Sequence, residues 1–368
     1  MLAQATNFME CALSLAKLAL GYTSPNPAVG AVIVKEEDII GLGYTQPPGS
    51  THAEVMALSQ AGVKARGATM YVTLEPCCHY GHTPPCTKAI IDAGISKVHI
   101  AILDPNPLVS GRGVKELEKA GVKIYLGECE QGAYELNEAY IKFITTGLPF
   151  VTAKFAMSLD GKLATKSGDS KWISSDEARK YIHNLRHTVD AIMVGINTVM
   201  IDNPKLTARS SSGKGGKMKL QPLRVIVDGK GRVPLTAQIF KESGSVLIAA
   251  TDSLNIQKVG DLGKVGAETA QLPAKEGLVD LEELLRMLGR RKVTSILVEG
   301  GGALFGSLFD QGLVDKVLAF VSPIIIGGDE AKTVVGGKGV SKVAEALQLN
   351  RIKVEKFDNT ILISGYTK

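Results

Sequence analysis

The sequence has few aromatic residues, no long apolar run and no recognisable leader segment. Aromatic residues make up only 5% of its 368 positions, with a single tryptophan, which argues against a platform on which nucleic-acid bases stack. No stretch approaches the roughly 20 consecutive apolar residues that a membrane-spanning helix needs. The apolar first 20 residues lack an early basic group and contain Glu10, so we expect an amphipathic helix of the fold rather than a signal peptide.

The cysteines are few and unevenly placed. Cys77, Cys78 and Cys86 lie close together and the total of five is odd, whereas a secreted disulfide scaffold would space an even number along the chain. This pattern favours a reduced, cytoplasmic protein with a metal site. The formal net charge of +5 comes from the second half, because acidic residues outnumber basic ones before residue 149. The first half therefore offers no basic run for a nucleic-acid backbone.

Strand-like and helix-like segments alternate through both halves of the chain, as in an α/β protein. The first half predicts a hairpin followed by a mostly parallel sheet, and the second half ends in another hairpin. The TTGLPF segment, with Gly147 and Pro149, marks a boundary, so we predict two domains, residues 1–147 and 148–368. Residues 133–147 repeat apolar positions at helical spacing, which predicts a helix leading up to that boundary.

The most informative cluster is His52, Cys77 and Cys86, one imidazole and two thiols. Three protein ligands would leave the fourth position of a tetrahedral zinc open, as in catalytic rather than structural sites. Glu54 follows the histidine by two positions, where it could take a proton from water and return it to a leaving amine. The H-x-E and P-C elements are typical of zinc nucleobase deaminases, although eight residues instead of two separate the cysteines. A structural zinc, or buried cysteines without metal, is the plainer alternative, and Cys78 is a competing thiol that we expect to point elsewhere.

Several segments resemble the bifunctional riboflavin biosynthesis deaminase/reductase family. In the first half these are SPNPAVGAVIV, HAEVMAL and TLEPCCHYGHTPPCTKAII; in the second they are KFAMSLDGKLAT, GDSKWISS, LRHTVDAIMVG, NTVMIDNPKLTAR and LVEGGG. The resemblance covers nearly the whole chain in matching order. It implies a cytidine-deaminase-like three-layer α/β/α domain followed by a dihydrofolate-reductase-like α/β domain.

The resemblance also implies two successive reactions on small phosphorylated pyrimidines. The first is zinc-dependent hydrolytic deamination of 2,5-diamino-6-ribosylamino-4(3H)-pyrimidinone 5′-phosphate. The second is reduction of the ribosyl group of 5-amino-6-(5-phosphoribosylamino)uracil to ribityl with NADPH. We accordingly expect one Zn²⁺ per chain, NADPH, no nucleic-acid or membrane partner, and self-association into a homo-oligomer.

The resemblance assigns roles to individual residues. His52, Cys77 and Cys86 match the zinc ligands, and Glu54 matches the catalytic proton shuttle. Asn26 and His79 match positions at which the family contacts the pyrimidine. Contacts to the cofactor match Ala156, Trp172, Thr198, Asp202, Gly301, Gly302, Ala303, Leu304, Phe305, Gly306 and Ser307. Contacts to the phosphorylated substrate of the reductase match Ser170, Arg186, Leu206, Arg209 and Glu299. The chain departs from many members at Thr45, where they have histidine, and at His82, where they have lysine or arginine; both bear on the phosphate contacts of the deaminase half.

Without the family, the second half carries weaker signals. In SILVEGGGALFGSLF a strand leads through a glycine run into a helix, whose first N–H groups attract anions. Phe305, however, stands where a G-x-G-x-x-G fingerprint has its last glycine, and a tight turn explains the glycines equally well. Arg186 and Arg209 are candidate phosphate forks. Glu299 ends an apolar strand, where α/β sheets bind ligands.

Two other functions share these features. One is a nucleic-acid (tRNA) editing deaminase with an accessory nucleotide-binding domain, which the acidic balance of the first half disfavours. The other is a non-catalytic nucleotide-binding protein with a structural zinc, in which Glu54 beside His52 would have no use.

Overall fold

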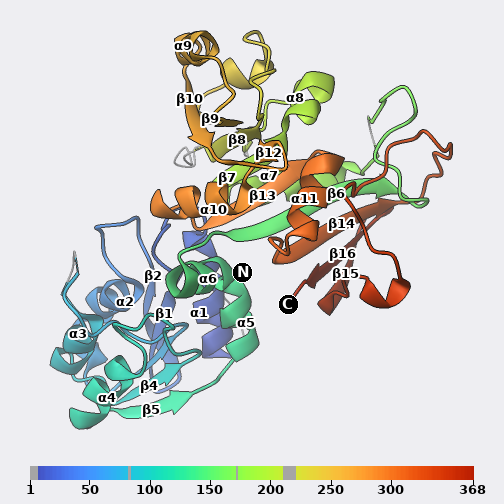
Figure 1. Cartoon of the computed structure of the whole chain (residues 1–368). Helices are drawn as coiled ribbons and strands as arrows, with labels where there is room; N and C mark the ends of the chain where they lie inside the picture. The colour runs from blue at the N-terminus through green and yellow to red at the C-terminus, as the bar shows by residue number, and fades with distance from the viewer. Residues whose placement is uncertain (1–6, 82–83, 171–172, 210–220) are drawn as a thin grey trace. The chain divides into compact units, whose positions relative to one another are not determined.

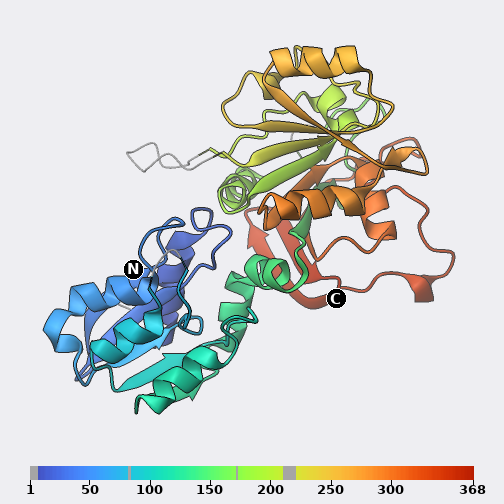
Figure 2. The same cartoon turned by 60° about the vertical axis from the view of Figure 1, so that its left-hand side comes forward.

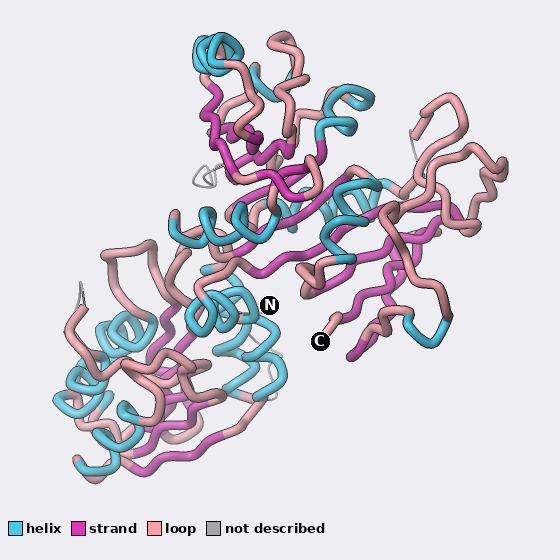
Figure 3. Tube along the Cα trace, in the orientation of Figure 1, coloured by secondary structure: helices cyan, strands magenta, loops and turns pink. Residues whose placement is uncertain are grey.

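The computed structural model describes residues 7–81, 84–170, 173–209 and 221–368, so Trp172 and His82 lie outside the described residues. The chain divides into two compact units, Met1–Gly147 and Leu148–Lys368. In each unit, helices pack on one main β-sheet (Figure 1, Figure 3). Within the described part of the chain, no helix combines the length and the apolar character needed to cross a membrane.

The first unit is built on a five-stranded sheet of order β2-β1-β3-β4-β5. Its strands are β1 (Gly30–Lys35), β2 (Asp38–Tyr44), β3 (Thr69–Val72), β4 (Lys97–Ile100) and β5 (Lys123–Leu126). Its helices are α1 (Phe8–Ala16), α2 (Ala53–Ala61), α3 (Cys86–Asp92), α4 (Arg112–Lys119), α5 (Glu130–Leu136) and α6 (Glu138–Thr146). β3, β4 and β5 are parallel, whereas β1 is antiparallel to both β2 and β3. The predicted hairpin is confirmed, and in this five-stranded sheet β1 runs opposite to the other four strands, as expected for a mostly parallel sheet.

Glycines let helices approach both faces of this sheet closely. A Cβ at Gly30 of β1 would overlap the Ala12 carbonyl of α1, and one at Gly43 of β2 would overlap the Ala53 carbonyl of α2. Gly43 pairs with Ala31, the neighbour of Gly30, so the two glycines face opposite sides of the pleat. Helices α1 and α5 therefore cover one face and α2, α3 and α4 the other (Figure 1), which is the three-layer arrangement expected from the resemblance.

The second unit is built on a nine-stranded sheet of order β10-β9-β8-β7-β13-β6-β14-β16-β15. Its strands are β6 (Phe150–Ser158), β7 (Ala191–Gly195), β8 (Leu223–Val227), β9 (Val246–Thr251), β10 (Ala267–Leu272), β13 (Ser295–Gly300), β14 (Lys316–Ser322), β15 (Asn350–Phe357) and β16 (Thr360–Tyr366), beside a small pair, β11 (Ala274–Lys275) and β12 (Leu278–Val279). Its helices are α7 (Asp176–Arg186), α8 (Ile196–Asp202), α9 (Ile256–Lys264), α10 (Leu281–Arg290) and α11 (Gly302–Asp310). In the order of the sheet, the seven strands from β10 through β9, β8, β7, β13 and β6 to β14 run parallel to one another. The predicted C-terminal hairpin, β15–β16, is confirmed and joins the sheet through β16, which is antiparallel to β14.

Alternate residues along β7 separate the two faces of this larger sheet. Ala191 and Met193 pack in a cluster with α10 and α11, whereas Ile192 and Val194 pack in a cluster with α8 and α9. Figures 1 and 2 show α9 and α10 on opposite sides of the strands. Because α8 follows β7 and α11 follows β13, both helices begin at the carboxyl ends of neighbouring parallel strands, where α/β sheets bind ligands.

The helix expected over residues 133–147 is broken in two. α5 ends at Leu136 and α6 begins at Glu138, with Asn137 between them at φ −109° and ψ 16°. The Asn137 side chain is hydrogen-bonded to the backbone of Ala28, far away in the sequence. The apolar spacing continues across the break, so periodicity alone could not show it.

Candidate functional site

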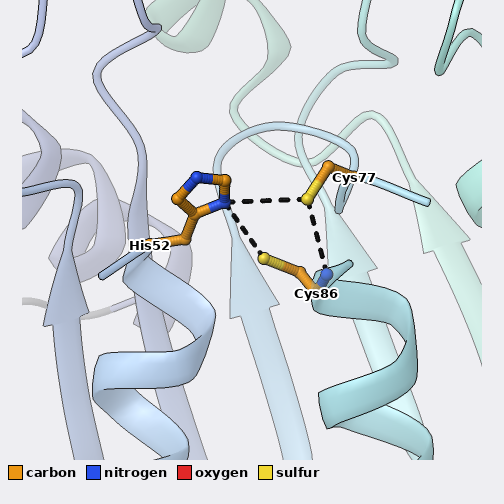
Figure 4. A group of neighbouring side chains, drawn as sticks. All are labelled: His52, Cys77 and Cys86. Atoms are coloured by element: carbon orange, nitrogen blue, oxygen red, sulfur yellow. Dashed lines mark hydrogen bonds between the residues drawn. The ribbon is translucent and has the colours of Figure 1, made fainter. Parts of the chain in front are cut away.

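Three side chains from three segments meet at one end of the first sheet (Figure 4). His52 immediately precedes α2, Cys77 lies in the loop after β3, and Cys86 is the first residue of α3. His52 Nδ1 lies 3.2 Å from Cys86 Sγ and 3.6 Å from Cys77 Sγ, and the three donor atoms all lie within 4.8 Å of one another. One nitrogen and two sulfur donors at this spacing fit a tetrahedral zinc with one position open.

The two thiols of this group differ in their surroundings. The Cys86 thiol and the Cys86 backbone N–H, at 3.4 Å, both hydrogen-bond to Cys77 Sγ. These bonds lower the pKa of Cys77, which favours the thiolate that binds metals. The neighbouring Cys78 points away, with its Sγ 3.8 Å from the Leu108 carbonyl oxygen, and is not part of the group.

Glu54 lies in the first turn of α2 and is only 4% exposed. Its burial, reinforced by the negative charge of Cys77, raises the pKa of Glu54 to about 7. A carboxyl group with a pKa near neutrality can both accept and donate a proton. Its position beside His52 thus combines a metal-binding group with a proton-transfer group.

The other two deaminase positions lie at the same end of the sheet. β1 begins where its antiparallel partners β2 and β3 end. The loop that contains Asn26 precedes β1, whereas His52 follows β2, and Cys77 and His79 follow β3. Asn26 is exposed, and His79 Nδ1 is buried without a hydrogen-bond partner among the described residues. Both side chains are therefore available to a ligand.

The second unit contains a cavity of about 670 Å³ beside the start of α11. Of the positions expected to contact cofactor or substrate, those that line it are Ala156, Ser170, Arg186, Thr198, Asp202, Arg209, Glu299, Gly301 and Phe305. Those that do not are Leu206, Gly302, Ala303, Leu304, Gly306 and Ser307. Leu206 is instead buried in the apolar cluster under α8, with a positive φ of 52°.

The glycine run serves two different purposes. Gly301 has a φ of +100°, a conformation that favours glycine, and it precedes α11 at the cavity. Gly306 lies one turn into the helix, where a Cβ would overlap the backbone of Gly336. The Gly336 N–H also donates to the Gly302 carbonyl at 2.9 Å. Packing therefore requires glycine at position 306, whereas Gly301 borders the ligand cavity, and a Cβ at Gly302 would make only ordinary van der Waals contacts.

Arg186 and Glu299, expected to act separately, form a buried ion pair in the cavity wall. Arg186 Nε lies 2.6 Å from Glu299 Oε1 and Nη2 lies 2.8 Å from Oε2, while Nη1 donates to the Thr207 carbonyl at 3.1 Å. Burial tends to raise the pKa of Glu299, but the charge and hydrogen bonds of Arg186 hold it below its usual value. Glu299 is thus a carboxylate, and most of the Arg186 fork is already engaged.

Among the cavity residues that the sequence analysis did not single out, two titratable ones have pKa values lowered by burial. Lys154 of β6 is half-buried, desolvation lowers its pKa, and its Nζ lies over the Phe320 ring, 5.8 Å from the ring centroid. His183 of α7 also lines the cavity, and burial lowers its pKa too. A lysine inside the apolar strand FVTAKFAMS was a signal that could have identified Lys154.

Comparisons with known proteins agree with this division. Residues 2–102 match the family model for the zinc-binding region of cytidine and deoxycytidylate deaminases, and residues 149–363 match the model for the RibD C-terminal domain. The chain is 44% identical to riboflavin biosynthesis protein RibD of Aquifex aeolicus, over 97% of each chain. It is 40% identical to the Escherichia coli protein of the same name, over 93% of each.

Solved structures give the same result. Acinetobacter baumannii RibD is 38% identical, with a TM-score of 0.86 over 100% of this chain and 99% of that one. A diaminohydroxyphosphoribosylaminopyrimidine deaminase/5-amino-6-(5-phosphoribosylamino)uracil reductase from Thermotoga maritima is 37% identical, with a TM-score of 0.84 over 98% and 97%. Nothing in these matches supports a nucleic-acid editing deaminase. The family expected from the sequence motifs is confirmed, and the chain belongs to the RibD family of riboflavin biosynthesis proteins.

Proposed function

We propose that the first unit is a zinc-dependent pyrimidine deaminase and the second an NADPH-dependent reductase, which act in succession. The substrates are the two phosphorylated pyrimidines named in the sequence analysis, and the name of the Thermotoga maritima relative describes the same pair of activities. The observation that carries the proposal is the donor set His52, Cys77 and Cys86 with a buried carboxyl group beside it. The test is ammonia release, followed by consumption of NADPH, when the purified chain is given the diaminopyrimidine substrate.

In the deaminase unit, His52, Cys77 and Cys86 would hold one zinc ion, which supplies Lewis-acid polarisation of the attacking water. Glu54 accepts a proton from that water at a carboxylate oxygen and donates it to the leaving amine. Asn26 and His79 hydrogen-bond to the pyrimidine ring and orient its amino-bearing carbon toward the water. The burial of Glu54 keeps competing water away from this proton transfer.

In the reductase unit, bound NADPH would supply the hydride, and the protein orients the sugar. Glu299, held as a carboxylate by Arg186, can accept hydrogen bonds from the hydroxyl groups of the ribosyl chain. Lys154 lines the cavity, and its Nζ donates a hydrogen bond to the substrate. Ser170 and Arg209, which both line the cavity, bind the phosphate. Among the described residues, Arg209 makes one hydrogen bond, from Nε to Thr207 Oγ1, so its two Nη groups can donate to the phosphate. Leu206 does not line the cavity and is proposed as a substrate contact on the basis of the family motif alone.

The cofactor fits the cavity beside the glycine run. Ala156, Thr198, Asp202, Gly301 and Phe305 line the cavity and are proposed to contact NADPH. Gly302, Ala303 and Leu304 form the first turn of α11, whose free N–H groups attract phosphate. Gly306 and Ser307 lie beyond that turn and are proposed as contacts on the basis of the family motif alone. Trp172 is proposed as a further contact on the basis of the family motif alone.

A carboxylate at Gly301 should weaken NADPH binding. Two like charges ~4 Å apart at an effective dielectric constant of ~20 repel by about 4 kcal/mol, and a third of that corresponds to about a tenfold loss of affinity. We therefore expect Gly301→Asp to raise the Kd for NADPH at least tenfold in a fluorescence titration. Gly312→Asp is the matched control, because Gly312 also has a positive φ but lies in open space at the end of α11. Equal affinity in the two variants would mean that Gly301 is only a turn residue.

The two activities should be separable. Residues 1–147 and 148–368 each contain a main sheet and apolar clusters of their own. We expect a fragment of residues 1–147 to bind zinc and deaminate, and a fragment of residues 148–368 to bind NADPH. Zinc analysis, ammonia assay and NADPH titration on the purified fragments test this. Two fragments that unfold although the full chain folds would contradict it. The homo-oligomeric state and the cytoplasmic location stay predictions.

A further inference from the structure

The segment between the two family matches contributes to the deaminase end of the first unit. The zinc-binding-region model ends at residue 102 and the RibD C-terminal model begins at residue 149, so α5 and α6 belong to neither. Two side chains of this segment, Asn137 and Tyr140, nevertheless reach loops at the end of the sheet where the metal donors lie. The segment is therefore more than a connection to the second unit.

Asn137 is 2% exposed, and both ends of its amide hydrogen-bond to Ala28, while Nδ2 also donates to the Ala133 carbonyl at 3.5 Å. The Ala28 N–H donates to Asn137 Oδ1 at 2.9 Å, and Asn137 Nδ2 donates to the Ala28 carbonyl at 3.1 Å. The side-chain amide of asparagine carries a donor and an acceptor, so it can pair with the N–H and the carbonyl of one residue as the backbone of a neighbouring strand would. The two bonds fix the backbone position of Ala28 against the junction of α5 and α6.

The two residues after Ala28 are held in a similar way. The Val29 N–H donates to Thr45 Oγ1 at 3.1 Å, and the Gly30 N–H donates to Thr73 Oγ1 at 3.1 Å. Both threonines are buried. Three consecutive backbone positions are thus fixed by side chains from three separate segments. Because these hydrogen bonds are buried, they hold the start of β1 rigidly, and with it the preceding loop that contains Asn26.

The α6 helix supports a second loop at this end of the sheet. Tyr140 donates its hydroxyl hydrogen to Asp104 Oδ1 at 2.9 Å, in the loop after β4. The Asp104 N–H in turn donates to Glu75 Oε2 at 3.2 Å, two residues before Cys77. The helices α5 and α6 therefore fix both the loop before β1 and the loop beside the metal donors.

We propose that Asn137 is a positioning residue of the deaminase site, which holds the loop of residues 24–28 so that Asn26 faces the pyrimidine. This proposal rests on the proposed function, in which Asn26 contacts the substrate. Asn26 lies two residues before Ala28, so a shift of Ala28 moves Asn26 with it. A misplacement of about 1 Å at a binding group can cost about 10²-fold in catalytic efficiency, kcat/KM.

The test is a double-mutant cycle between Asn137 and Asn26 in the full chain, read as KM and kcat for ammonia release. We expect Asn137→Ala to raise KM by about tenfold or more, with a smaller change in kcat and with zinc content and NADPH-dependent reduction unchanged. Because Asn137 acts through Asn26, it should add little to the KM of Asn26→Ala. Asn7→Ala is the matched control, since it removes an asparagine cap of α1 in the same unit, away from the loop.

Each outcome bears on a separate claim. If Asn137→Ala fails to fold, Asn137→Asp, which keeps the acceptor for the Ala28 N–H but loses the donor, takes its place. A KM that changes no more than in Asn7→Ala, or effects of Asn137→Ala and Asn26→Ala that multiply, would overturn the positioning role while the proposed function stands. Absence of ammonia release from the unmodified chain would overturn the proposed function and this proposal with it.

Discussion

Replacement of Glu54 by glutamine should lower ammonia release by about 10²–10⁴-fold, the usual contribution of a positioned proton-transfer group. The amide has nearly the same shape as the carboxyl group but cannot accept a proton and return it. Glu54 is almost fully buried, and burial raises its pKa to about 7. A neutral side chain therefore suits this position, and we expect Glu54→Gln to fold, to retain zinc and to reduce its second substrate with NADPH.

The measurement compares the two activities and the zinc content on one preparation. Glu130→Gln is the matched control, since Glu130 is also an acidic residue in the first turn of a helix of the same unit but is exposed. Ammonia release at the rate of the unmodified chain would show that Glu54 is not the proton shuttle. Loss of the zinc as well would show that the carboxyl group helps to hold the metal rather than to move a proton.

Chemically distinctive residues could be predicted from the sequence. His52, Cys77 and Cys86 are rare residue types in a fixed pattern, and the structure brings their donor atoms within 4.8 Å of one another. The alternation of strands and helices depends on local periodicity, and both sheets and the two hairpins follow from it. Features that a short window of sequence contains were therefore accessible.

Contacts between distant segments could not be predicted. Arg186 and Glu299 are 113 residues apart, and each seemed a free ligand-binding group until the structure paired them. Asn137 and Ala28 are 109 residues apart, so nothing local showed that a helix would break at Asn137. The pairing of buried polar groups depends on which segments become neighbours in the fold, and periodicity carries no information about that.

The different roles of the glycines around the start of α11 also depend on contacts between distant segments. Gly301 and Gly306 belong to the same glycine-rich segment, but glycine is required at position 306 because α11 there packs against the backbone of Gly336. A glycine-rich segment before a helix therefore predicts that another group approaches its backbone closely. Only the fold shows whether that group is a ligand or another segment of the chain.

Replacement of either proposed zinc thiol should abolish deamination. Serine has the shape of cysteine, but its hydroxyl is not ionised at neutral pH and is a poor zinc ligand, so Cys77→Ser and Cys86→Ser each leave two strong donors. Substitution of a residue that only hydrogen-bonds to a metal ligand lowers metal affinity about 10–100-fold. We expect the loss of a direct ligand to lower the affinity for zinc by more than this. Metal analysis after dialysis against a chelator should find little zinc in either variant and no ammonia release.

Cys78→Ser is the matched control, because Cys78 is the sequence neighbour of Cys77 while its Sγ points toward the Leu108 carbonyl. It should keep its zinc and its deaminase rate. NADPH-dependent reduction by the second unit serves as an internal measure of the amount of intact chain in each preparation. Equal zinc loss in all three variants would mean that Cys78 also supports the site. Zinc retained in Cys86→Ser but lost in Cys78→Ser would replace Cys86 by Cys78 as the second thiol, against the 3.2 Å approach of Cys86 Sγ to His52 Nδ1.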